Sequence, residues 1–255
     1  LIGIMGNIQA YLARKRYIDY DLNRSWTEEQ VKKLKHNGKT IQFREDREMI
    51  ELIDFFDSLP KNTYTEKICV DLHTTSADNG NFIVVSESSA DHPVIGALRL
   101  PLILDLEKHI RGTLLKYLEK RNILCFAFEG GLIGSEVAVE LHMAGIWEIL
   151  LTSGAVNKKY LEDILQMTTL LQTFSAELPD KLRVKYHYWI TEGDEFKMKP
   201  GFMNFQRIKK GEVIAEDCNG EIIAPMDGLI FMPLYQRSGN DGFFIVEEID
   251  PLNKF

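Results

Sequence analysis

The sequence predicts an α/β protein that ends in a small β-rich part. Up to about Gln172, short apolar runs alternate with segments of helical periodicity, which is the pattern of an α/β domain. After Pro179 the chain changes to short alternating segments separated by glycine-containing turns, as in small antiparallel sheets. With 255 residues, 45% of them hydrophobic, the chain is long enough for one sizeable core and a smaller second domain. We therefore expect two domains, at residues 1–178 and 179–255.

Apolar runs and helical spacing give the elements of the first domain. Strands are expected at Leu1–Met5, Ile68–Leu72 and Ile123–Phe128. Their near-continuous apolarity is typical of strands that are covered on both faces. Helices are expected at Phe43–Leu59, Gly112–Lys120, Glu136–Leu150 and Asn157–Phe174. In the first of these helices apolar residues recur at helical spacing, and Pro60 follows its end.

The second domain is expected to be a small antiparallel β structure. Its strands are expected at Arg183–Trp189, Phe205–Lys209, Val213–Ala215, Glu221–Ala224 and Gly228–Pro233. Turn signals lie between them at Lys210-Gly211, Asn219-Gly220 and Asp227-Gly228.

Charge and cysteine content limit the classes of function. The formal net charge of −8 argues against a nucleic-acid partner or an anionic membrane surface, although it allows a local basic pocket for an anionic substrate. The three cysteines are widely spaced and odd in number, so we expect no disulfide framework and a cytoplasmic protein. No stretch is long and apolar enough to span a bilayer. The oligomeric state, including a homo-oligomer, stays open.

Asp71-Leu72-His73 ends one of the predicted strands. An imidazole at the carboxyl end of a buried parallel strand lies where open α/β sheets bind ligands. Histidine is a common zinc ligand, and Asp71 could orient its ring. The alternative is that His73 is a hydrogen-bonded residue at a strand end with no metal.

Glu129 follows the next apolar strand and precedes Gly130-Gly131. A carboxylate in this position could take a proton from a metal-bound water and pass it to a leaving amine. The alternative is an acidic residue near the start of the helix predicted from Glu136, where the helix macrodipole favours negative charge.

Arg16, Asn23 and Arg24 lie in one short polar segment. Arginine binds a carboxylate through two hydrogen bonds and stabilises an oxyanion, and asparagine donates a hydrogen bond without adding charge. The alternative is a surface loop in which the basic residues pair with Asp19 and Asp21. The adjacency of Asn23 and Arg24 favours a formed site.

These motifs occur in one order along the chain. Gly6-Asn7 with Ala10 is followed by R-Y-I-D-Y-D-L-N-R at Arg16–Arg24, D-L-H-T-T-S from Asp71 with Asn79, and F-E-G-G from Phe128. Together they resemble the aspartoacylase and succinylglutamate desuccinylase family, a group of zinc-carboxypeptidase-like hydrolases. The resemblance implies a zinc-carboxypeptidase-like α/β domain, with a mixed central sheet and flanking helices, and a small C-terminal β domain.

The resemblance also implies roles for the candidate residues. His73 would be a ligand of one zinc ion per chain, and Glu129 the general base and acid. Arg16 would polarise the scissile carbonyl, while Asn23 and Arg24 would hold a substrate carboxylate. The implied reaction is hydrolysis of a small anionic N-acyl amino acid, such as N-succinylglutamate or N-acetylaspartate, to a carboxylate and a free amino acid.

The chain departs from the family pattern in its metal ligands. The family takes two further zinc ligands from an H-x-x-E motif before the Gly-Asn segment, and no histidine here has Glu three residues later. Because Leu1 already corresponds to the region after that motif, we expect an upstream segment to be absent from this sequence. Three interpretations stay open: a zinc-dependent deacylase, a metal-free anion-binding or interaction protein with the hydrolase fold, and a zinc carboxypeptidase.

A second departure concerns the substrate. Family members that take N-acetylaspartate place a tyrosine near the substrate, whereas the comparable stretch here reads Gly242-Phe243-Phe244. Tyr235 is the nearest alternative. Arg111 and Arg121 are near the position of a further substrate-binding arginine without matching it.

Overall fold

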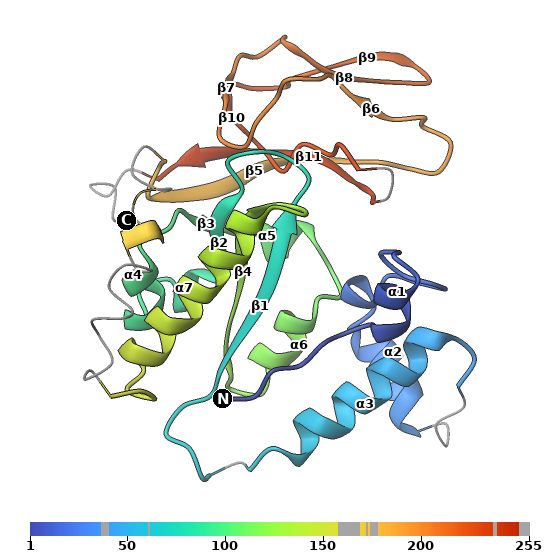
Figure 1. Cartoon of the computed structure of the whole chain (residues 1–255). Helices are drawn as coiled ribbons and strands as arrows, with labels where there is room; N and C mark the ends of the chain where they lie inside the picture. Colours follow the sequence, from blue (N-terminus) through green and yellow to red (C-terminus); the bar gives the residue numbers. More distant parts are fainter. Residues whose placement is uncertain are drawn as a thin grey trace. The chain divides into compact units, whose positions relative to one another are not determined.

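The computed structural model describes residues 1–36, 41–60, 62–157, 169–171, 173, 178–236 and 239–249. The chain forms two compact units, one of Leu1–Cys69 with Glu107–Cys125 and one of Val70–Leu106 with Phe126–Phe255. We call them unit 1 and unit 2. Figure 1 shows their elements, and among the described residues no helix is long and apolar enough to cross a membrane.

The regular elements of unit 1 are mainly helices. They are α1 (Ile8–Leu12), the 3₁₀ turn η1 (Leu22–Arg24), α2 (Glu28–His36), α3 (Arg44–Ser58), α5 (Leu106–His109, at the unit boundary) and α6 (Leu114–Glu119). The helices α3 and α6 confirm the expected ones. The sequence prediction missed α2, whose buried residues are only Val31 and Leu34.

The expected strand at Leu1–Met5 is wrong. Residues 1–7 form neither helix nor strand, and Leu1 is 97% exposed. A strand needs a neighbour for its backbone hydrogen bonds, and no strand in the described part of the chain pairs with this segment. Apolar composition alone therefore misled the prediction here.

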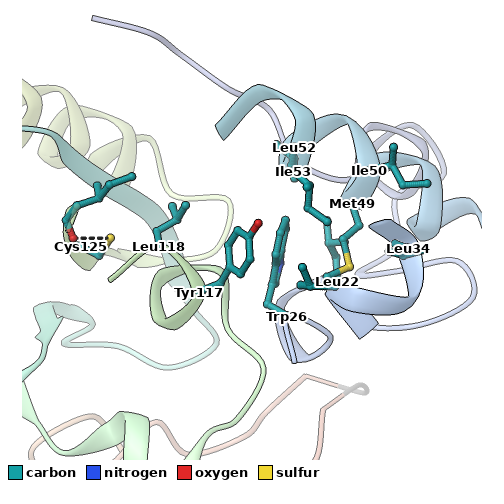
Figure 2. Packing of buried hydrophobic residues seen from close by; sticks show 12 residues of the cluster. Leu22, Trp26, Leu34, Met49, Ile50, Leu52, Ile53, Tyr117, Leu118 and Cys125 are labelled. Carbon is teal, nitrogen blue, oxygen red and sulfur yellow. Dashed lines mark hydrogen bonds between the residues drawn. The ribbon is translucent and has the colours of Figure 1, made fainter. Parts of the chain in front are cut away.

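The core of unit 1 joins the η1 region to α2, α3 and α6. Leu22, Leu34, Met49 and Leu118 are buried in it. Figure 2 shows the rings of Trp26 and Tyr117 side by side in this cluster, with centroids 5.0 Å apart. The backbone N–H of Trp26 donates to the carbonyl of Gly112, so the chain after η1 is tied to the loop before α6.

An eight-stranded sheet organises the rest of the chain. Its order is β1 (Ile68–Thr75), β4 (Leu124–Leu132), β2 (Asn81–Val85), β3 (Leu102–Leu104), β5 (Lys181–Trp189), β11 (Asp241–Glu248), β10 (Gly228–Phe231) and β7 (Arg207–Ile208). The β2–β3 and β3–β5 pairs are parallel. The β2–β4, β5–β11, β11–β10 and β10–β7 pairs are antiparallel. This mixed sheet with flanking helices confirms the predicted α/β fold class.

Helices flank the strands of unit 2. They are the 3₁₀ turn η2 (Glu87–Ser89), α4 (Pro93–Leu98) and α7 (Glu136–Thr152). Figure 1 shows α7 running along β4, and a side chain added at Gly145 of α7 would meet the ring of Phe128. The helix α7 confirms the one expected at Glu136–Leu150. The helix expected at Asn157–Phe174 falls mostly outside the described residues.

A second sheet packs beside the C-terminal strands. It contains β6 (Lys197–Met198), β8 (Val213–Asp217) and β9 (Gly220–Ile223), in the order β6-β8-β9. Ile214 of β8 shares a buried core with Ile230 of β10 and Phe243 of β11. Since β5 pairs with β3, the main sheet continues past residue 178. The division into domains at residues 1–178 and 179–255 stays a prediction.

Candidate active site

Asp71 and His73 form a pair on β1. They are two residues apart, so their side chains point to the same face of the strand. The Nε2 atom of His73 lies 2.9 Å from Oδ2 of Asp71. The carboxylate therefore orients the imidazole ring, as the D-L-H spacing predicts.

Glu129 lies on β4, the strand next to β1. Its side chain is only 6% exposed. Cys69 of β1 and Cys125 of β4 pack in the same apolar cluster, so they share one face of the sheet. Because side chains alternate along a strand, His73 and Glu129 also share that face. The structure thus places the predicted metal ligand and the predicted general base on neighbouring strands, pointing the same way.

The other three candidate residues lie in unit 1. Arg16 Nε forms an ion pair with Oδ2 of Asp21, at 2.8 Å, as the surface-loop alternative expects. Asn23 Oδ1 accepts a hydrogen bond from the Leu114 N–H at 3.0 Å, and Arg24 Nη1 donates to the Asn23 carbonyl. The amide oxygen of Asn23 is thus engaged, and its Nδ2 is the group that could donate to an anion.

The buried carboxylate of Glu45 anchors the loop that contains Ile18 and Asp19. Glu45, at the start of α3, is fully buried and accepts hydrogen bonds from the N–H groups of Ile18 and Asp19 at 2.6 and 3.0 Å. Asn7 Nδ2 donates to the same carboxylate at 3.2 Å. Burial alone would raise the pKa of Glu45, but these hydrogen bonds outweigh it and the pKa is lowered. Glu45 is therefore a charged anchor of the loop.

Asp46, the next residue of α3, also accepts a hydrogen bond from this loop. It accepts the hydroxyl of Tyr20 at 2.9 Å, and burial together with this hydrogen bond raises the pKa of Tyr20. The sequence did not predict either of these anchors. The available signal was a pair of acidic residues in the first turn of a helix, which is common enough at helix starts to look like ordinary capping.

His142 was another residue whose position the sequence did not reveal. On α7 its ring is half-buried, and its Nε2 lies 3.1 Å from the carbonyl oxygen of Phe128. Burial lowers the pKa of His142.

The described residues do not fit a complete zinc site. Among them, no group of three or more His, Cys, Asp and Glu side chains is arranged to hold a metal ion. A catalytic zinc normally has three protein ligands, and the family resemblance suggests that role for only one residue of this sequence, His73.

The hydroxyl of Tyr235 is engaged with backbone groups of the C-terminal region. Its hydroxyl accepts a hydrogen bond from the Phe202 N–H at 2.8 Å and lies 2.9 Å from the Lys199 carbonyl oxygen. It thus links two turns of the C-terminal region. Arg121 is similarly engaged, because its guanidinium lies 3.7 Å above the Tyr117 ring and pairs with Asp57.

We expect Tyr235→Phe to lower the free energy of unfolding by about 1 kcal/mol, because it removes a hydroxyl that bridges backbone groups. Activity should stay within twofold of wild type. Urea unfolding and kcat/KM measure the two effects. A tenfold fall in kcat/KM at unchanged stability would instead indicate contact with substrate.

Residues 1–135, more than half of the chain, match the family model of the succinylglutamate desuccinylase/aspartoacylase catalytic domain. The chain belongs to this family. The resemblance read from the R-Y-I-D-Y-D-L-N-R, D-L-H and F-E-G-G motifs is confirmed, and with it membership of a group of hydrolases.

Two relatives extend the similarity beyond the matched domain. A probable aspartoacylase of Prochlorococcus marinus (strain NATL2A) is 25% identical over 244 residues, which are 91% of this chain and 74% of the relative. A probable aspartoacylase of Synechococcus sp. (strain CC9605) is 28% identical over 191 residues, which are 72% of this chain and 55% of the relative.

Solved structures of the family share the fold. The succinylglutamate desuccinylase of Vibrio cholerae superposes with a TM-score of 0.60 at 16% identity, over 96% of this chain and 69% of the other. A mutant of murine aminoacylase 3 gives a TM-score of 0.58 at 19% identity, over 96% and 81%. These similarities support the zinc-carboxypeptidase-like α/β fold.

Proposed function

We propose that this protein is a zinc-dependent deacylase that hydrolyses the amide bond of a small anionic N-acyl amino acid, such as N-succinylglutamate or N-acetylaspartate. Membership of the family supports the reaction class. The observation that supports it most is the placement of the Asp71–His73 pair and of Glu129 on one face of neighbouring strands. The zinc ion of the family would supply Lewis-acid activation, with His73 as its ligand from this chain.

In this proposal Glu129 transfers the proton. Its carboxylate takes a proton from the attacking water and returns it to the nitrogen of the leaving amine, so that one group serves as base and then as acid. Its place on a strand of the central sheet, with little exposure, fixes its position and limits competing contact with bulk water.

The charged loop of unit 1 binds the substrate in this proposal. Arg24 and the Nδ2 group of Asn23 donate hydrogen bonds to the carboxylate of the amino-acid product. Arg16, whose Nε is paired with Asp21, polarises the scissile carbonyl in this proposal. A fixed cation there stabilises the tetrahedral oxyanion.

We expect Arg24→Leu to raise KM for an N-acyl dicarboxylic amino acid by about 10- to 100-fold, since a charge-assisted hydrogen bond contributes about 1.5–3 kcal/mol. The free energy of unfolding should change much less. Steady-state kinetics with a panel of N-acyl amino acids measures the effect, and Lys15→Leu in the same charged segment is the control. An unchanged KM would exclude Arg24 from the substrate site.

The same panel separates the alternatives. Turnover of small N-acyl amino acids supports the deacylase. Binding of these anions without turnover supports the metal-free anion-binding protein, and release of C-terminal residues from peptides supports the carboxypeptidase.

A further inference from the structure

The ring of His142 lies against the strand that carries Glu129. The residue is in the middle of α7, and its Nε2 is 3.1 Å from the carbonyl oxygen of Phe128. The imidazole stands edge-on to the ring of Phe128, with centroids 5.0 Å apart and an interplanar angle of 88°. Helix α7 thus contacts β4 through a polar group directly before Glu129.

Gly130 leaves the space that this ring occupies. A Cβ atom built at Gly130 would lie 2.5 Å from Nε2 of His142 and 2.7 and 2.8 Å from its ring carbons. All three distances are shorter than real Cβ contacts allow. The first glycine of the F-E-G-G motif is therefore required by the close approach of His142 to the strand.

The same ring also reaches β1. A second backbone hydrogen bond joins it to His73. This bond acts to raise the pKa of His142, while burial, the largest effect, and the charge of the His73 ring act to lower it. A hydrogen bond raises the pKa of an imidazole when its partner is an acceptor, so the partner is the carbonyl oxygen of His73. A neutral imidazole has one N–H, so each tautomer donates to one of the two carbonyls.

We propose that His142 is a positioning residue for the reaction: it contacts the peptide groups that follow His73 and precede Glu129 and so fixes the spacing of these two side chains. The proposal rests on the proposed function for its catalytic meaning. The Phe128 carbonyl belongs to the peptide plane of the Glu129 nitrogen, so holding one atom orients the backbone from which the Glu129 side chain projects.

The structural half of the proposal is tested by NMR, without any substrate. In His142→Leu, which keeps the bulk of the ring, the carbonyl ¹³C signal of Phe128 should move upfield as its hydrogen bond is lost, and that of His73 should move to the extent that the second tautomer is populated in the wild type. Glu140→Gln, an exposed position on the same helix, is the control and should leave both signals in place. Unchanged carbonyl signals in His142→Leu would overturn the proposal, whatever the activity of the protein.

A pair of substitutions tests the close approach of ring and glycine. Gly130→Ala should lower the unfolding midpoint in the wild-type background and much less in His142→Ala, where the ring is gone. An equal effect in the two backgrounds would contradict the assigned contact.

Kinetics on the protein expressed from its complete reading frame tests the catalytic half. His142→Leu should lower kcat by 10- to 100-fold with KM within twofold, and His142→Gln, which retains a hydrogen-bond donor, should recover most of kcat. A loss that His142→Gln does not recover, or a parallel rise in KM, would overturn the positioning role. Absence of turnover in the wild type would contradict the proposed function, while the carbonyl signals would still decide whether His142 joins the strands.

Discussion

Glu129→Gln is expected to reduce kcat by about 10²- to 10⁴-fold, the usual contribution of a general acid–base group. Glutamine has the same shape, so the buried position on β4 should still be filled and the fold retained. The amide cannot accept the proton of the attacking water or return it to the leaving amine. The measurements are kcat, the free energy of unfolding and the zinc content of the full-length protein.

Two results would contradict this role. If Glu129→Gln loses zinc in parallel with activity, Glu129 holds the metal instead of moving protons. If kcat falls less than threefold, another residue is the base. Glu140→Gln, exposed on α7, is the matched control for the change of carboxylate to amide.

Glu45→Gln is expected to lower the free energy of unfolding by about 3 kcal/mol, because it replaces a buried carboxylate that accepts three hydrogen bonds. The amide NH₂ group would face N–H donors of the loop. Since this loop continues to Asn23 and Arg24, KM for the anionic substrate should rise as well. Glu51→Gln, exposed on the same helix, is the control.

The effect of Glu45 should depend on pH. Its pKa is lowered in the folded protein, so its contribution to stability is present above the ordinary pKa of glutamate and is lost as pH falls through the lowered value. The difference in unfolding free energy between wild type and Glu45→Gln should therefore be constant near neutral pH and shrink below about pH 4. Urea unfolding at several pH values measures it. A difference that persists unchanged at low pH would mean that the carboxylate charge contributes nothing.

The sequence predicted the elements that have strong local signals. Helix α3 has apolar residues at helical spacing and a following proline, and β4 is apolar along most of its length, so both were found. Strand β3 has only three residues, and β2 has five, too short for periodicity to distinguish them from loop. At Leu1–Met5 the local signal of a strand was present but the pairing partner was not. Pairing is a tertiary property that composition does not contain.

In the candidate site, too, the sequence predicts the local contacts and misses those that depend on packing. The contact of Asp71 with His73 follows from a spacing of two residues on a strand, so the sequence was sufficient to predict it. The hydrogen bonds of Glu45 to Asp19 and Ile18 span 26 and 27 positions of the sequence. Similarly, His142 meets Phe128 only because α7 folds back on β4. Such contacts depend on how the elements pack, which a single sequence without homologues does not reveal.

The proposal that His73 binds zinc is tested by elemental analysis. Zinc is measured in the protein expressed from its complete reading frame and in its His73→Ala variant. We predict close to one zinc ion per chain in the wild type and its loss in His73→Ala, with the fold retained. Absence of zinc from the wild type, or zinc that His73→Ala leaves in place, would contradict the assignment of His73 as a metal ligand and favour the metal-free anion-binding protein.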